Sequence, residues 1–239
     1  MLDISGLSVR MGGQAVLDDI TTRVDDGELV YLLGRNGTGK TTLLRTICGV
    51  IHPAAGRILI DGKRFSELDA PPTVIGMHLG TDAAHPGHSA RRHLTWLARA
   101  GGIPTGRVAE VLDLVGLTDV AGRRVVDYSL GMRQRLGIAS ALLGDARTLV
   151  LDEPVNGLDI NGIRWLRGLL RDLADDGRRL LIASHHLDEV ARTADRVVVL
   201  NSGRIAADAP LAEFVGVSAD LEEAYLATVG GQTPAGVTA

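Results

Sequence analysis

One stretch of this chain constrains its fold more than any other, a glycine-rich loop between an apolar run and a segment with helical spacing. The loop, Gly34-Arg35-Asn36-Gly37-Thr38-Gly39-Lys40-Thr41-Thr42, matches the pattern G-x-x-x-x-G-K-[ST]. The run Leu29–Leu33 before it is typical of a buried parallel strand, and Thr41–Val50 after it has helical spacing. Such glycines let backbone N–H groups curl around an anion, and the helix adds its positive N-terminal end. A chance glycine-rich turn is the alternative, but it leaves the flanking strand and helix unexplained, so we expect a nucleotide phosphate site.

The loop also supplies two chemical groups. The Lys40 ammonium can contact the β- and γ-phosphates, and the Thr41 hydroxyl can ligate Mg²⁺. A second Mg²⁺ anchor is predicted at Asp152, which follows the apolar strand Thr148–Leu151 and so reaches the carboxyl edge of the sheet. Glu153 comes next and is the candidate general base for an attacking water. The alternative for this acidic pair is a helix N-cap before a proline.

The order of predicted elements indicates an α/β fold. Leu2–Val24 alternates as a hairpin around Met11-Gly12-Gly13-Gln14, and strands then alternate with helices. The further strands are expected at 57–62, 73–79, 148–151, 179–183 and 196–200, and the helices at 93–100, 107–115, 131–143, 160–174 and 187–194. We predict a mainly parallel sheet with an antiparallel β-subdomain at the N-terminus and an inserted helical subdomain. One domain spans 1–228, with a core at about 1–80 and 146–215, helices at about 81–145, and a flexible tail at 229–239.

Composition excludes several function classes. The 239 residues carry a net charge of −4 and only 3% aromatic residues, which argues against nucleic acid as a partner. The single Cys48 cannot form an internal bridge and fits a reducing compartment. The N-terminus has no signal-peptide pattern, and the apolar runs are strand-sized rather than long enough to span a bilayer. We expect a soluble, cytoplasmic protein.

Three further motifs give the chain a family resemblance. Tyr128-Ser129-Leu130-Gly131-Met132-Arg133-Gln134-Arg135-Leu136 resembles the signature L-S-G-G-Q followed by R-Q-R, with Ser129 and Gly131 in place and Tyr128, Leu130 and Met132 departing from it. Glu153–Asp159 and Ser184–Glu189 resemble the segment after the catalytic Glu and the switch-histidine motif. With the loop, these motifs resemble the ATP-binding cassette (ABC) family, specifically the nucleotide-binding subunit of a transporter, over Leu2 to about Tyr225.

The resemblance implies a RecA-like P-loop NTPase fold and a homodimer. Two copies pack head to tail over two ATP molecules, and Ser129 and Gly131 of one copy close over the ATP of the other. His185 is implied to contact the γ-phosphate, with Glu153 as the base, and Asp159 to touch the partner's loop. From the residues alone, Ser129 and Asp159 are equally ordinary helix N-caps, and His186 is a surface or packing residue.

Two positions depart from the family pattern. Met11 stands where an aromatic usually stacks on adenine, so base contact is expected to be softer. After the strand 73–79 the family carries a Gln, where this chain has Gly80, with His78 and Asp82 as the nearest polar candidates. Weak or partner-dependent ATPase activity follows as a hypothesis, which fails if the isolated subunit hydrolyses ATP as fast as the assembled complex.

The predicted function is an ATPase that powers transport, with ATP and Mg²⁺ as cofactors. Because the chain has no predicted membrane span, it would act at the inner face of the membrane through a separate multi-spanning permease, with export expected by similarity to bacterial drug and antibiotic exporters. The alternative is a soluble non-transport ABC ATPase of the iron–sulfur-assembly type. A DNA-repair type needs a long coiled coil that does not fit between Gly39 and Ser129, a translation type needs two cassettes, and a non-hydrolysing regulatory binder conflicts with Glu153.

Overall fold

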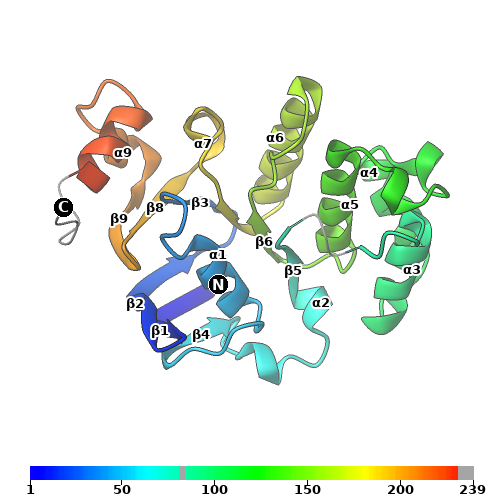
Figure 1. The fold of residues 1–239 in the computed structure, drawn as a ribbon, viewed down its shortest axis with the longest axis horizontal. Coiled ribbons are helices and arrows are strands. Elements are labelled where there is room, and N and C mark those ends of the chain that lie inside the picture. Colours follow the sequence, from blue (N-terminus) through cyan, green and yellow to red (C-terminus); the bar gives the residue numbers. More distant parts are fainter. Residues whose placement is uncertain (81–83, 231–239) are drawn as a thin grey trace.

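The computed structural model describes residues 1–80 and 84–230. Within these residues the strands form two sheets, a three-stranded sheet in the order β2-β1-β4 and a six-stranded sheet in the order β5-β6-β7-β3-β8-β9 (Figure 1). The strands are β1 Leu2–Met11, β2 Gln14–Val24, β3 Leu29–Leu33, β4 Ala55–Ile60, β5 Ile75–His78, β6 Thr148–Asp152, β7 Arg179–Ala183, β8 Arg196–Asn201 and β9 Arg204–Pro210. The α-helices are α1 Lys40–Ile47, α2 Pro71–Val74, α3 Ala90–Ala100, α4 Arg107–Leu114, α5 Leu130–Leu142, α6 Ile160–Asp175, α7 Leu187–Thr193, α8 Leu211–Val215 and α9 Leu221–Gly230.

The six-stranded sheet confirms the predicted parallel core. Strands β5, β6, β7, β3 and β8 pair in parallel, and β9 adds an antiparallel edge. Buried side chains of β3 alternate between two hydrophobic clusters: Leu29, Tyr31 and Leu33 face one cluster, and Val30 and Leu32 face the other. A sheet covered on both faces accounts for the continuous apolar runs in its strands.

The N-terminal sheet is also as predicted. β1 and β2 form an antiparallel hairpin in which Met11 pairs with Gln14, and β4 pairs with the other edge of β1. The side chains that this sheet buries pack with α1 against the six-stranded sheet. This packing places the entry to α1 at the carboxyl end of β3.

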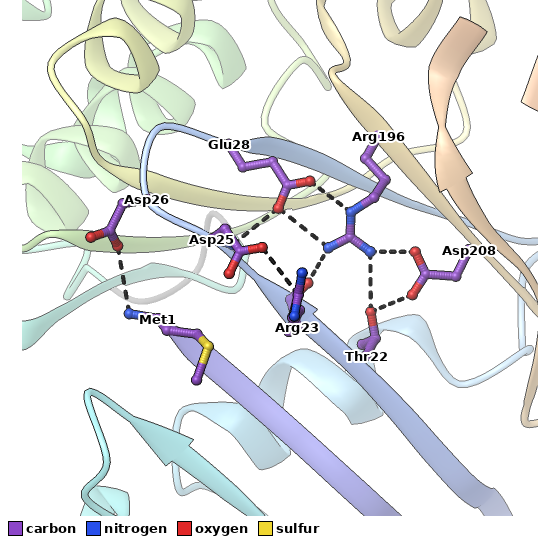
Figure 2. A network of polar contacts seen from close by, with 8 residues as sticks. All are labelled: Met1, Thr22, Arg23, Asp25, Asp26, Glu28, Arg196 and Asp208. Carbon is purple, nitrogen blue, oxygen red and sulfur yellow. Dashed lines mark hydrogen bonds and ion pairs between the residues drawn. The ribbon is translucent and has the colours of Figure 1, made fainter. Parts of the chain in front are cut away.

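Two arginines tie the two sheets together, of which Arg179 is buried and Arg196 is half-buried. Arg196, on β8, donates from Nε to Glu28 Oε1 at 2.7 Å and also contacts Asp208 on β9 and the Arg23 carbonyl on β2 (Figure 2). Arg179, on β7, is only 2% exposed. Its guanidinium contacts Asp26 and Asp61 at 2.6 and 2.8 Å. Both arginines therefore link segments that lie far apart in the sequence.

The helices α3, α4 and α5 lie together at one end of the molecule, beside β5 (Figure 1). The expectation of a strand from Thr73 is wrong at its start, since Pro71–Val74 form a helical turn with proline at its first positions, which favours helix, and β5 begins only at Ile75. The signature helix begins at Leu130, one residue earlier than expected. β9, α8 and α9 were not predicted. The expected start of the flexible tail at residue 229 is wrong, since α9 continues to Gly230, and residues 231–239 lie outside the described residues.

None of the helices in 1–80 and 84–230 combines the length and apolar character needed to cross a bilayer.

Candidate active site

The glycine-rich loop leaves the carboxyl end of β3 and enters α1, as the sequence predicts. Gly37 and Gly39 have φ angles of 82° and 107°, which lie in the region that favours glycine. A Cβ at Gly39 would lie 2.7 Å from Leu17 Cδ2 on β2. The Thr38 hydroxyl donates to the Arg35 carbonyl at 2.9 Å. Glycine at position 39 therefore allows the loop to lie closely against the N-terminal sheet.

Lys40 is buried within this loop. Its Nζ donates to the carbonyl oxygens of Gly34 and Arg35 at 2.6 and 3.3 Å. Burial lowers the pKa of Lys40, while the carboxylates of Glu153 and Asp152 act in the opposite direction. The ammonium is held inside the curve of the loop, where a phosphate group would meet it.

Thr41 and Asp152 meet although they lie far apart in the sequence. The Thr41 hydroxyl donates to Asp152 Oδ2 at 2.7 Å, across the gap between α1 and the end of β6. Two oxygen ligands placed side by side match the hard-oxygen preference of Mg²⁺. The predicted ligand pair is therefore brought together.

Glu153 has an unusual backbone. Its φ is 49° although it is not glycine, and its N–H donates to the Ala183 carbonyl at the end of β7 at 2.9 Å. Its Oε1 lies 2.9 Å from His185 Nδ1. Among the described residues, its buried Oε2 has no hydrogen-bond partner. An unpaired carboxylate oxygen is available to accept a proton from a water molecule.

The two adjacent histidines differ in their contacts. His185 is half-exposed and faces Glu153, whereas His186 Nε2 lies 3.0 Å from Asn156 Oδ1. Their ring centroids are 4.1 Å apart. The ligand atoms of Glu153, His185 and His186 lie within 4.8 Å of one another, so a metal ion that prefers nitrogen could also be held here. Sequence reasoning treated His186 as a surface or packing residue and did not find its contact with Asn156.

These groups surround a cavity of about 420 Å³. The residues that line it are Val16, Asn36, Gly37, Gly39, Lys40, Thr41, Thr42, Gly80, Leu130, Gln134, Asp152, Glu153 and Asn156. Gly34, Arg35 and His185 line an adjoining cavity of about 290 Å³ on the other side of the loop. The structure thus gathers the phosphate loop and both predicted carboxylates around one space.

Ser129 and Gly131 lie at the start of α5 and are not among the residues that line this cavity. Ser129 is the N-cap, and its hydroxyl accepts from Met132 N at 3.2 Å. A Cβ at Gly131 would lie 3.0 Å from the Gly157 carbonyl, so the signature packs closely on the segment that follows Glu153. Leu130, between them, reaches the cavity lining and is half-exposed.

Asp159 is the N-cap of α6. Its Oδ1 accepts from Gly162 N at 2.7 Å, and it does not line the cavity. The N-cap interpretation of Asp159 and of Ser129 is therefore confirmed within one copy, while their implied contacts with a second copy remain predictions.

The structure does not bring Met11 to the cavity. Met11 is 51% exposed at the tip of the β1–β2 hairpin, and Val16 on β2 lines the cavity instead. Met11 pairs with Gln14 at the turn of the hairpin, whereas Val16 lies against the phosphate loop, its carbonyl oxygen 3.2 Å from the position of a Cβ at Gly39.

The three residues considered in place of the family's Gln after β5 lie in different surroundings. Gly80 has a φ of 134° and lines the 420 Å³ cavity. His78 is buried at the end of β5, and Asp82 lies outside the described residues.

Gln134 was not predicted as a site residue. It is 2% exposed, lines the cavity, and donates from Nε2 to the Glu153 carbonyl at 3.1 Å. The sequence signal that could have indicated it is a polar residue at a position of α5 that is buried, since polar residues are seldom buried without a specific partner.

A second, larger groove of about 690 Å³ lies between β5 and the helices α3 and α5. Its wall is mostly apolar, and its charged lining residues are arginines, Arg45 and Arg133. Trp96, on α3, is 60% exposed at this groove.

The sequence around the site matches a known family. The family described as ABC transporter matches residues 17–156, a segment that contains the loop, the signature helix and the Asp152–Glu153 pair. The chain belongs to the ABC transporter family. As an ABC protein it is an ATP-binding subunit that hydrolyses ATP to drive transport, and ABC ATPases of this kind work with a membrane permease.

Individual relatives agree with this assignment. An uncharacterized ABC transporter ATP-binding protein of Bacillus subtilis, YdbJ, is 38% identical over 88% of this chain and 70% of its own length. The lantibiotic transport ATP-binding protein SrtF of Streptococcus pyogenes is 32% identical over 94% of this chain and 96% of its own. A solved structure of an ATP-binding subunit of an ABC transporter superposes with a TM-score of 0.87 at 30% identity, covering 95% of this chain and 99% of that one. These relatives support a transporter subunit over the non-transport alternative.

Proposed function

We propose that this ABC subunit hydrolyses ATP at the cavity between the phosphate loop and Glu153. The observation that carries the proposal is the convergence of Thr41 and Asp152, 2.7 Å apart, beside the buried Lys40 and the Glu153–His185 pair. The loop residues Gly34–Thr42 bind the phosphates with their N–H groups, and Lys40 turns from the loop carbonyls to the β- and γ-phosphates.

Thr41 and Asp152 would hold Mg²⁺. When bound there, the ion neutralises charge on the β- and γ-phosphate oxygens. Glu153 accepts the proton of the attacking water at its unpaired Oε2, and His185 steadies the Glu153 carboxylate and donates to the γ-phosphate. Met11 remains the candidate contact for adenine, now together with Val16, which lines the cavity.

The active unit in this proposal is a pair of identical chains. Ser129 and Gly131 stand at the positive end of α5 but outside the cavity of their own copy, so they are available to the ATP of a second copy. Asp159 would contact the loop of that copy while it caps α6. One domain over about 1–228 carries both surfaces.

The groove beside β5 is proposed as the contact with a separate permease. The subunit would then work at the cytoplasmic face of the membrane, and transport would run outward. The near full-length match to a lantibiotic transport ATP-binding protein, at 96% of its length, supports a transporter subunit. Co-expression with the product of the adjacent gene, followed by affinity capture of this subunit, should recover a multi-spanning membrane protein. Recovery of only a soluble scaffold or ribosomes would overturn the proposal.

Glu153→Gln tests the chemistry. This change keeps the shape of the side chain but removes the base, so we expect ATP binding to persist and turnover to fall at least about 100-fold. The variant should accumulate as an ATP-bound dimer in size-exclusion chromatography with light scattering. Wild-type protein with ATP and EDTA is the control for the metal. Turnover by Glu153→Gln at the wild-type rate would contradict the assignment of the base.

A further inference from the structure

The backbone of Glu153, which carries the proposed catalytic carboxylate, has a strained conformation. Glu153 has a φ of 49°, and a non-glycine residue in this region persists only where its surroundings hold it. Three hydrogen bonds do so: Glu153 N donates to Ala183 O at 2.9 Å, and Glu153 O accepts from Gln134 Nε2 at 3.1 Å and from Asn156 N at 3.2 Å. The first comes from the sheet, the second from the signature helix, and the third from the turn that follows Glu153.

Gln134 is placed to set the direction of the Glu153 side chain. It is buried, and a buried amide is stable only where it is hydrogen-bonded. The Glu153 carbonyl is the partner of its donor group. The carboxylate belongs to the same residue as this carbonyl, and hydrogen bonds at both the N–H and the C=O of Glu153 fix the peptides on either side of its Cα, and with them the direction of the Cα–Cβ bond. A misplacement of about 1 Å in a reacting group can cost about 100-fold in rate.

His78 connects Gln134 to the permease groove. Its ring lies against α5 at Gly137, one turn after Gln134, where a Cβ would come 2.3 Å from the ring Nδ1 and Cε1. The ring is 3% exposed and lines the 690 Å³ groove. In the described part of the chain its Nε2 has no hydrogen-bond partner.

The buried position of His78 favours the neutral form of its ring. Burial lowers the pKa of His78, and the Gln134 side chain and the Asp152 carboxylate act in the opposite direction. The imidazole is therefore neutral at pH 7 and has one donor and one acceptor nitrogen. Gly80, two residues further on, lines the catalytic cavity with its backbone but has no side chain to place in it.

We propose that Gln134 is a positioning residue for Glu153, and that the buried contact of His78 with the signature helix beside Gln134 links the groove to the catalytic carboxylate. This inference rests on the proposed role of Glu153 as the base. In this chain, the path from groove to active site then runs through α5 rather than through a side chain at Gly80.

The first test is Gln134→Met in the full chain, which keeps the length of the side chain but removes the donor. Single-turnover hydrolysis at saturating Mg-ATP should slow about 10- to 100-fold, while the Kd for ATP stays within about twofold. Because ATP then binds normally but is hydrolysed more slowly, the ATP-bound dimer should accumulate, as it does in Glu153→Gln. Ile138→Val, a buried change one turn further along α5, is the matched control and should keep the wild-type rate.

The second test is His78→Leu, alone and combined with Gln134→Met. If both residues act through one path, the double variant should be no slower than the slower single variant. Fully additive losses in log kcat would overturn the link to His78. Thermal unfolding of each variant checks folding, and Gln134→Leu replaces Gln134→Met if that variant does not fold.

The outcomes separate this inference from the proposed function. Wild-type turnover in Gln134→Met, or a joint loss of ATP binding and hydrolysis, would overturn the positioning role while Glu153→Gln remains inactive. Normal turnover in Glu153→Gln would instead remove the base assignment on which the inference rests.

Discussion

At the scale of single residues, Lys40 shows how the loop holds its cation. The ammonium donates to two carbonyl oxygens of the loop itself, which partly compensates for its burial. The charge therefore lies within the curve of the loop, where the β- and γ-phosphates would meet it.

Lys40→Ala should lower ATP affinity at least about tenfold, because a charge-assisted contact with phosphate contributes about 1.5–3 kcal/mol. Isothermal titration with ATP measures this loss. Lys63→Ala, at an exposed lysine outside the site, is the matched control. An unchanged Kd in Lys40→Ala would show that the loop amides alone bind the phosphates.

The residues that sequence reasoning found and missed differ in kind. Lys40, Thr41, Asp152 and Glu153 were found because they follow directly on strands or on a loop of fixed pattern, and the backbone alone carries them to one edge of the sheet. Gln134 was missed because its role depends on which face of α5 meets Glu153. A helix that is buried on several sides does not show that face in its apolar pattern.

At the scale of elements, β5 and α5 approach each other unusually closely. A Cβ at Gly76 on β5 would lie 1.9 Å from the Ala141 carbonyl on α5, and one at Gly144, just after α5, would lie 1.7 Å from the Pro72 carbonyl on α2, just before β5. Both obstacles are backbone atoms, which a side-chain rotation cannot move. The strand that borders the groove and the signature helix should therefore move as one body.

Gly76→Ala should destabilise the fold by about 1–3 kcal/mol or more, since it overpacks a backbone contact. Chemical denaturation measures the loss. Gly168→Ala is the matched control, because Gly168 lies inside α6 with nothing within 4 Å of its Cβ position, and alanine there should stabilise the helix by about 0.5–1 kcal/mol. If Gly76→Ala and Gly168→Ala unfold at the same denaturant concentration, the space between β5 and α5 can widen to accept a methyl group.

The element predictions succeeded where burial on both faces produced apolar runs and failed at the edge of the sheet. β9 alternates exposed and half-buried residues through Ala206, Ala207 and Asp208, and alanine and aspartate are depleted in strands. Its pairing with β8 holds it in place, so only the tertiary context could show it. At Thr73, proline at the start of a helical turn outweighed the β-propensity of the following residues.

At the scale of the whole molecule, acidic partners of Arg179 make stability depend on pH. The hydrogen bond from Arg179 lowers the pKa of Asp26. Burial raises the pKa of Asp61, but hydrogen bonds from the Met1 amine and from Arg179 outweigh it, so the pKa of Asp61 is also lowered. A carboxyl group with a lowered pKa in the folded state stabilises the fold above its unfolded pKa of about 3.9, and this contribution is lost as the pH falls through the folded value.

Asp61→Asn should therefore flatten the fall of the melting temperature between about pH 5 and pH 3. The control Asp69→Asn, at an exposed carboxylate, should leave that fall almost unchanged. Calorimetry across this range measures both curves against wild type. If Asp61→Asn loses stability on acidification as steeply as wild type, Arg179 does not couple the two sheets through this carboxylate.

The exposed indole of Trp96 has a practical consequence for the assembled transporter. The chain has two tryptophans. The other, Trp165, is half-buried, and the Arg135 guanidinium lies over its ring, with Cζ 4.2 Å from the ring centroid. Water-exposed indole emits at longer wavelengths than shielded indole, so the red edge of the intrinsic fluorescence belongs mainly to the side chain at the groove. A permease segment that settles there should shift the emission to the blue and protect it from iodide quenching, so docking can be followed without any attached dye.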